Sequence, residues 1–103
     1  MELNEIIVAK DNPVYDSREG CNAVIETKTN TLVAGCGNSF IPNSVTAIGR
    51  MAFHGCGTLS EIEIPGSVKE FGENAFRYCG RLYKAVIGEG VEKIPAGCFS
   101  SND

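Results

Sequence analysis

The chain contains 103 residues, of which 43% are hydrophobic and 21% are charged. This length allows one domain at most, and these proportions exclude an intrinsically disordered chain. The net charge is -4, with nine Lys and Arg residues scattered among thirteen acids, so no nucleic-acid partner is expected. No apolar run approaches the roughly 18 residues that span a bilayer, so no membrane insertion is expected. Glu2 and Asn4 follow Met1 closely, which is unlike a signal peptide.

Residues 1–40 are expected to form a divergent first unit. In residues 3–8 (L-N-E-I-I-V) the apolar positions follow the pattern L-x-x-L-x-L, which predicts a half-buried strand. Residues 22–26 and 31–34 are rich in β-branched and small apolar residues and are joined by a polar turn. We therefore expect a β-hairpin, at about residues 21–36, that is inserted into this unit or caps it.

From residue 41 the sequence repeats itself at steps of 23 residues. The segment I-P-N-S-V at 41–45 recurs as I-P-G-S-V at 64–68 and, more loosely, as I-G-E-G-V at 87–91. Several columns, meaning positions 23 residues apart, hold one residue type: Phe53, Phe76 and Phe99; Cys56 and Cys79; Leu59 and Leu82. Such periodicity predicts stacked structural repeats. The expected units of a single domain, 1–103, are the first unit, 1–40, two full copies, 41–63 and 64–86, and a partial copy, 87–103.

Each copy has the pattern of a short strand followed by a turn. Residues 59–64 (L-S-E-I-E-I) alternate between apolar and acidic side chains, which predicts a half-buried strand with its isoleucines inward. Pro65 ends that strand, because proline has no N–H to donate. Ala75, Phe76 and Cys79 are spaced as on one helical turn packed against a core. Since no copy buries its apolar side chains alone, we expect a β-rich repeat solenoid of short strands and single helical turns.

These columns resemble the BspA-like leucine-rich repeats, whose repeat looks like I-P-x-S-V-T-x-I-G-x-x-A-F-x-x-C-x-x-L-x-x-I-x. Residues 41–63 match this pattern almost throughout, and residues 64–86 match it closely. The third copy departs further, with Gly88 and Pro95 in place of the usual residues. Residues 12–27 also look like an element common in bacterial members. The resemblance therefore extends over nearly the whole chain.

Members of this family are mostly surface-attached or secreted proteins of host-associated bacteria. The resemblance implies a right-handed α/β-type superhelix, a cell-surface or secreted location, and a role in protein binding or adhesion. It implies no enzymatic activity and no cofactor. The implied partner is a protein, such as a host extracellular-matrix or surface protein. The alternative hypothesis is a structural spacer whose repeats bind no partner of their own.

The cysteine columns are interpreted as part of the core. Cys56 and Cys79 lie one period apart among apolar positions, and Cys98 falls in a column otherwise held by alanine. A cysteine in such a place behaves as a small buried hydrophobe. With no C-x-x-C motif and one histidine in the chain, zinc spacing is missing and no metal site is expected.

Cys21 and Cys36 are a separate pair, because they flank the expected hairpin turn symmetrically. They face each other across the two strands if the turn centres between Lys28 and Thr29. A cross-strand disulfide is then geometrically possible, whereas a shift of one residue in register removes it. The sequence leaves both outcomes open.

No motif in the chain indicates catalysis or ion binding. His54 follows a core phenylalanine and is expected to be exposed, with no nucleophile or orienting acid tied to it. Asp11, Asn12 and Asp16 lack the calcium-loop pattern and are expected to serve as turn and cap residues. Residues 88–90 (G-E-G) lack the third glycine of a phosphate loop and are expected to form a turn.

The remaining functional candidate is the outward row of side chains on the stacked strands, because repeat proteins present such rows as extended binding surfaces. The residues of this expected binding face are Glu5, Ile7, Glu61, Glu63, Tyr83, Lys84 and Val86. A merely solvated face is the alternative. The last copy stops at position 17 of its 23 residues, so its core columns are expected to be exposed and to favour end-to-end self-association.

Overall fold

The computed structural model describes residues 3–95 and 97–99 and is rich in short strands. The described part of the chain contains one helical element, a short 3₁₀-helix, and no α-helix. In chain order the elements are β1 (Tyr15–Asp16), η1 (Arg18–Gly20), β2 (Val24–Glu26), β3 (Thr31–Ala34), β4 (Ala47–Ile48), β5 (Glu61–Ile64), β6 (Glu70–Phe71) and β7 (Lys84–Ile87). The expected partial copy, 87–103, is described except for position 96 and residues 100–103.

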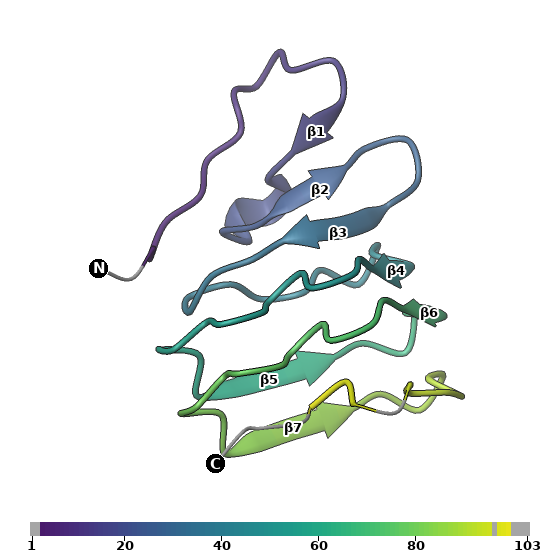
Figure 1. The fold of residues 1–103 in the computed structure, drawn as a ribbon. Helices are drawn as coiled ribbons and strands as arrows, with labels where there is room; N and C mark the ends of the chain where they lie inside the picture. The colour runs from purple at the N-terminus through teal and green to yellow at the C-terminus, as the bar shows by residue number, and fades with distance from the viewer. Residues whose placement is uncertain (1–2, 96, 100–103) are drawn as a thin grey trace.

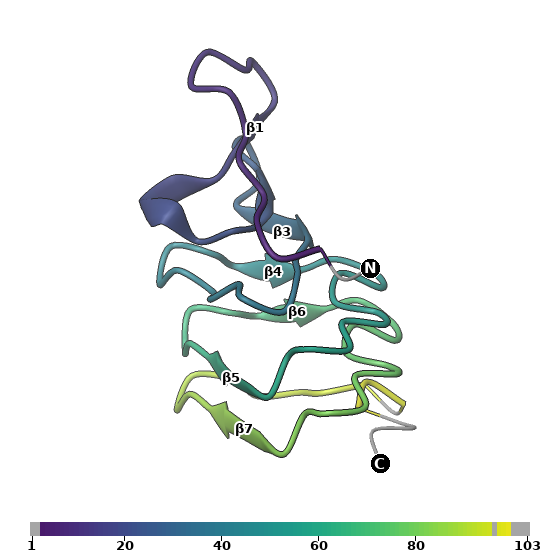
Figure 2. The ribbon, with the colours of Figure 1, turned by 90° about the vertical axis from the view of Figure 1, so that its left-hand side faces the viewer.

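The strands form two sheets, which the successive copies of the repeat share (Figure 1). One sheet has the order β1-β2-β3-β4-β6, and the other consists of β5 and β7. β4 pairs with β6 and β5 pairs with β7, both in parallel. Ala47 lies opposite Glu70 and Glu61 lies opposite Lys84, so the paired residues of β4 with β6 and of β5 with β7 are 23 positions apart. Figure 2 shows β4 above β6 and β5 above β7, at the same place in each copy.

The hairpin lies at one end of this stack. β2 and β3 pair in antiparallel fashion within the two segments expected to be strands, and β3 then pairs in parallel with β4. In this way Leu32 of the hairpin lies beside Ile48 of the first full copy. The hairpin therefore adds strands to the same sheet and covers the apolar side chains at that end.

The disulfide between Cys21 and Cys36, which the sequence left open, does not form, and both thiols are free and buried. Near the turn, Ile25 pairs with Leu32 as the symmetric register requires, but the register shifts between Val24 and Ile25. Beyond this shift the Cys36 thiol donates to the backbone oxygen of Asn22, at 3.6 Å. A shift of one residue therefore separates the two cysteines.

The expected single helical turns are hydrogen-bonded turns rather than helix. In the first full copy, alternate N–H groups donate to the next copy: Met51 N to Glu73 O at 3.0 Å and Phe53 N to Ala75 O at 2.7 Å. These N–H groups are no longer available to an α-helix. Met51, with φ 58°, is also left-handed, which a right-handed helix excludes. Hydrogen bonding between copies thus replaces hydrogen bonding within a helix.

The core consists of columns of like side chains, as the periodicity predicts. The rings of Phe53 and Phe76 stack at 4.9 Å between centroids, and those of Phe76 and Phe99 stack at 5.1 Å. Offset stacking of this kind adds about 1 kcal/mol beyond burial alone. A Cβ atom at Gly35 would overlap the Phe53 ring, so the hairpin closes the aromatic column with a residue that has no side chain.

The prediction that Cys56, Cys79 and Cys98 belong to the core is confirmed, because all three are buried. The Cys79 thiol also donates to Phe53 O at 3.1 Å, and the Cys56 thiol donates to Gly35 O at 3.6 Å. Each of these two thiols therefore fills the core and reaches a backbone oxygen earlier in the chain, closer to the hairpin. An alanine in this column would lose that second contact.

Candidate functional site

β5 presents one buried and one exposed row of side chains, whereas all four residues of β7 are exposed. In β5, Ile62 and Ile64 are buried, whereas Glu61 and Glu63 are exposed. The parallel register places Glu61 beside Lys84 and Glu63 beside Val86. The strand predicted over residues 59–64 is confirmed as β5, with the bounds Glu61–Ile64, and four residues of the expected binding face lie side by side on β5 and β7.

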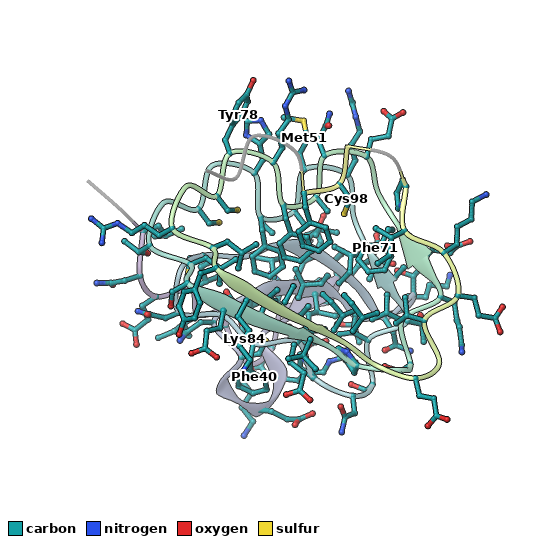
Figure 3. The ribbon with its side chains drawn as sticks, turned by 90° about the horizontal axis from the view of Figure 1, so that it is seen from below. Phe40, Met51, Phe71, Tyr78, Lys84 and Cys98 are labelled. Atoms are coloured by element: carbon teal, nitrogen blue, oxygen red, sulfur yellow. The ribbon has the colours of Figure 1, made fainter. Side chains whose placement is uncertain are left out.

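A groove of about 520 Å³ runs over this exposed row. Its walls include residues of three successive copies and of η1, among them Glu19, Phe40, Glu61, Glu63, Lys84 and Val86. We call this hollow the sheet-face groove. In the view of Figure 3, Phe40 and Lys84 lie on the same side of the molecule, away from Met51 and Tyr78.

Phe40 is a residue of this groove that the sequence analysis missed. It lies 23 positions before Glu63, so the three residues Phe40, Glu63 and Val86 form one column. Its side chain is 45% exposed, and its backbone N–H donates to Cys21 O at 3.1 Å. Neither of the other residues in its column is aromatic, so stacking of the copies does not require a phenylalanine there. The signal that would have found it is the 23-residue step counted backwards from β5.

Glu5 and Ile7 do not belong to the row in which they were expected. Residues 3–8 form no strand, and Ile7 is 76% exposed. Val8 N donates to the Ser17 hydroxyl at 3.1 Å, so this backbone group is used by a side chain rather than by a sheet. Asn4 O accepts from the Asn38 side chain at 2.9 Å, so this segment runs beside residue 38. Glu5 and Ile7 are exposed, and neither of them lines the groove.

Tyr83 lies at the margin of the row and is 73% exposed. Its hydroxyl donates to Glu61 Oε2 at 3.0 Å. This hydrogen bond to a carboxylate raises the pKa of Tyr83 above its usual value, because ionisation of the phenol would remove the bond. The contact engages Glu61 within the chain, so Glu61 is less available than Glu63 to an outside group.

The electrostatic character of the sheet-face groove is mainly acidic. Glu19, Glu61 and Glu63 line it together with one cation, Lys84. Within residues 3–95 and 97–99, the ion pairs are Asp16 with Arg18 and Arg50 with Glu73, so neither Glu63 nor Lys84 is in an ion pair. Glu63 is thus an exposed carboxylate between two apolar side chains of its own column.

A second groove, of about 610 Å³, runs along β4 and β6 and has the opposite charge. Its lining includes the cations Arg50, Lys69 and Lys93 over Ile48 and Phe71. Two of these cations already have partners within the chain. The Lys69 ammonium donates to Gly90 O at 3.0 Å, and the Arg50 guanidinium lies 3.9 Å from the Glu73 carboxylate.

The Asp16 carboxylate belongs to a structural clasp. The Arg18 guanidinium contacts both of its oxygens at 2.8 Å, and Thr27 donates to it at 2.6 Å. The hydrogen bonds from Arg18 hold the pKa of Asp16 well below its usual value. Asn12 accepts hydrogen bonds from the backbone N–H groups of Val14 and Tyr15, both at 2.8 Å. The turn and cap roles predicted for Asn12 and Asp16 are confirmed.

The nucleophilic and metal-binding side chains of the described residues are not assembled into a reactive centre. Burial raises the pKa of the thiols of Cys21, Cys79 and Cys98, which disfavours the reactive thiolate. His54 is exposed, as predicted. Its ring is nearly perpendicular to that of Tyr78, with 5.2 Å between the two ring centroids. In this part of the chain no three His, Cys, Asp or Glu residues are grouped as metal ligands would be. No helix there is long and apolar enough to cross a membrane.

Comparison with known proteins agrees with the repeat pattern. The family model described as BspA type leucine-rich repeat region matches residues 34–103, which is more than half of the chain. A leucine-rich repeat protein from Eubacterium ventriosum, solved as a crystal structure, is similar over 97% of this chain with a TM-score of 0.57 and 21% identity. The chain spans 34% of the length of that protein. A search of curated proteins found no match.

Proposed function

Because this chain belongs to the BspA-type leucine-rich repeat family, we propose that it is a non-catalytic protein-binding module of a surface or secreted protein. Proteins of this family are typically surface-attached or secreted in bacteria, and leucine-rich repeats generally mediate protein–protein interaction without catalysis. The proposed partner is a protein, such as a host extracellular-matrix or surface protein. The proposed contact surface is the sheet-face groove.

The observation that supports this proposal most strongly is the exposure of Phe40. Its side chain is 45% exposed in a groove lined by three successive copies. An exposed aromatic side chain in a concave, mostly polar surface is typical of an interface anchor. Val86, 44% exposed in the same column, extends this apolar surface across the stack.

The proposal also includes the architecture on which the groove depends. We take the chain to be part of a right-handed solenoid with a 23-residue period, in which each added copy lengthens the groove. The paired residues of β5 and β7, which are 23 positions apart, support this period. The alternative is a spacer whose repeats separate other domains and bind nothing, and it predicts no role for Phe40.

The test is a binding measurement against a panel of purified extracellular-matrix proteins, with the intact chain immobilised. We expect at least one panel protein to be retained, and the Phe40→Ala variant to bind it at least tenfold more weakly. The Arg50→Ala variant, changed in the other groove, is the matched control and should bind normally. If neither the chain nor a longer array of its repeats retains any panel protein, the spacer hypothesis is correct instead.

A further inference from the structure

Glu63 occupies a distinctive place in the sheet-face groove. In its column it lies between Phe40 and Val86, and these two side chains are 45% and 44% exposed. Glu63 and Val86 are paired across β5 and β7, which as neighbouring strands are about 4.8 Å apart. Phe40 lies one period earlier and outside the strands, and at the same repeat spacing the column spans about 10 Å. The chain therefore presents an apolar, an acidic and an apolar group in a line along one face.

Within the described part of the chain, the carboxylate of Glu63 accepts no hydrogen bond and forms no ion pair. Its neighbour Glu61 accepts the Tyr83 hydroxyl, whereas neither of the ion pairs there includes Glu63. Lys84 lies beside Glu61 rather than beside Glu63. Glu19, which lines the same groove, adds a second carboxylate. The local charge therefore favours a cationic group from outside.

From this arrangement we propose that the sheet-face groove binds an extended segment of the partner through one arginine side chain. The guanidinium of that arginine pairs with Glu63, and its methylene stem lies on Phe40 and Val86. Arginine fits better than lysine, because its planar guanidinium makes two parallel hydrogen bonds to a carboxylate and stacks on an aromatic ring. Its three methylene groups bury apolar surface while the charge remains at the groove.

An extended segment is the form of partner that fits this surface. About 10 Å corresponds to three residues of an extended chain, at roughly 3.3 Å each. Because side chains of an extended chain alternate between its two faces, the arginine over Glu63 shares the groove with the residues two positions before and after it. These two residues are about 13 Å apart, so they reach just beyond Phe40 on one side and Val86 on the other. The proposed recognition motif is an arginine between apolar residues. This inference rests on the proposed function, since it specifies what the protein-binding groove recognises.

The test is selection of peptides from a random dodecapeptide display library on the immobilised intact chain, followed by affinity measurement with synthetic copies. We expect the selected peptides to contain an arginine with apolar residues two positions before and after it. Glu63→Gln should weaken binding about fivefold and Phe40→Ala about tenfold, as expected for loss of a charge-assisted pair and of an aromatic contact. The control variant, Glu73→Gln, removes a carboxylate outside this groove and should bind as the parent does.

Reversing the charge at position 63 and in the peptide distinguishes loss of recognition from loss of folding. Glu63→Arg should lose the arginine peptide and gain the same peptide with glutamate in place of arginine. Selected peptides without arginine, or binding that is indifferent to Glu63 and Phe40, would overturn the inference. A library that yields no peptide at all would overturn it as well. In each of these cases the matrix-protein panel still decides separately whether the chain is a protein-binding module.

Discussion

The N-terminal hairpin and the repeat stack are held together by different forces. In the hairpin, β1, η1 and β2 are joined by polar side chains around the Asp16–Arg18 pair, and Arg18 also reaches Ser44 of the first full copy at 3.1 Å. In the repeats, columns of phenylalanine and cysteine are stacked over buried isoleucine, valine and leucine. The comparison teaches that periodic apolar columns build the stack. At its end, the hairpin adds a directional polar network to buried apolar side chains of its own, such as Ile25 and Leu32.

The largest effect is expected at the centre of the repeat stack. Phe76 is fully buried and stacks on Phe53 on one side and on Phe99 on the other. Phe76→Ala should lower the free energy of unfolding by about 4 kcal/mol, because it leaves a cavity and removes both ring contacts. Urea denaturation measures this change. Tyr78→Ala, at an exposed ring two residues away, is the control, and an equal loss there would show that the aromatic column has no special role.

The next effect is expected where the hairpin meets the repeats. A Cβ atom at Gly35 overlaps the Phe53 ring, whereas at Gly80 it meets no atom within 4 Å. Gly35→Ala should therefore lower the free energy of unfolding by about 2 kcal/mol, because the first copy must shift to admit the methyl group. Gly80→Ala should leave stability unchanged or raise it slightly. Equal thermal midpoints for the two variants would contradict this close contact.

The polar network of the hairpin should make stability depend on pH. The folded-state pKa of Asp16 is depressed by Arg18, so its contribution is complete above the unfolded pKa of about 3.9 and is lost as the pH falls from there through the lower folded pKa. We expect Asp16→Asn to cost about 1 kcal/mol at pH 7 and less than half of that near pH 2. Urea denaturation at several pH values checks this. A cost that does not change with pH would show that the charge of Asp16 is unimportant.

The smallest effect is expected at the turns. Met51 has φ 58° and Asn74, in the same column, also has φ 58°. Asparagine tolerates the left-handed region better than methionine does, and Met51 is 41% exposed, so little burial is at stake. Met51→Asn should therefore raise the free energy of unfolding by about 0.5 kcal/mol. A clear loss in calorimetry would indicate that the Met51 side chain contributes more than its backbone costs.

The same contrast explains how much could be predicted from the sequence. The registers of β5 with β7 and of β4 with β6 could be predicted, because identical residue types must lie in one column to share a core. The hairpin strands were also visible from their residue types. The register shift between Val24 and Ile25 was not, since it depends on hydrogen bonds from Cys36 and Ser39 to Asn22 O. Local patterns do not encode such bonds.

The candidate site was predictable only in part, for a related reason. Glu61 and Glu63 were found because they alternate with buried isoleucines in β5, and Lys84 and Val86 because they lie one period later in the sequence. Phe40 lies in an outward position where the residue type varies between copies, so periodicity gives it no signal. Residues 3–8 have the apolar pattern of a strand, yet they form none: Val8 N donates to the Ser17 hydroxyl, and Asn4 O accepts from the Asn38 side chain.

The central claim is that this chain binds a protein through the sheet-face groove. Amide hydrogen exchange on the complex with a retained matrix protein tests it most directly. We predict slower exchange on binding at residues 38–43, 61–65 and 84–86, and unchanged exchange at residues 50–55 and 69–73. Protection confined to residues 50–55 and 69–73 would contradict the claim.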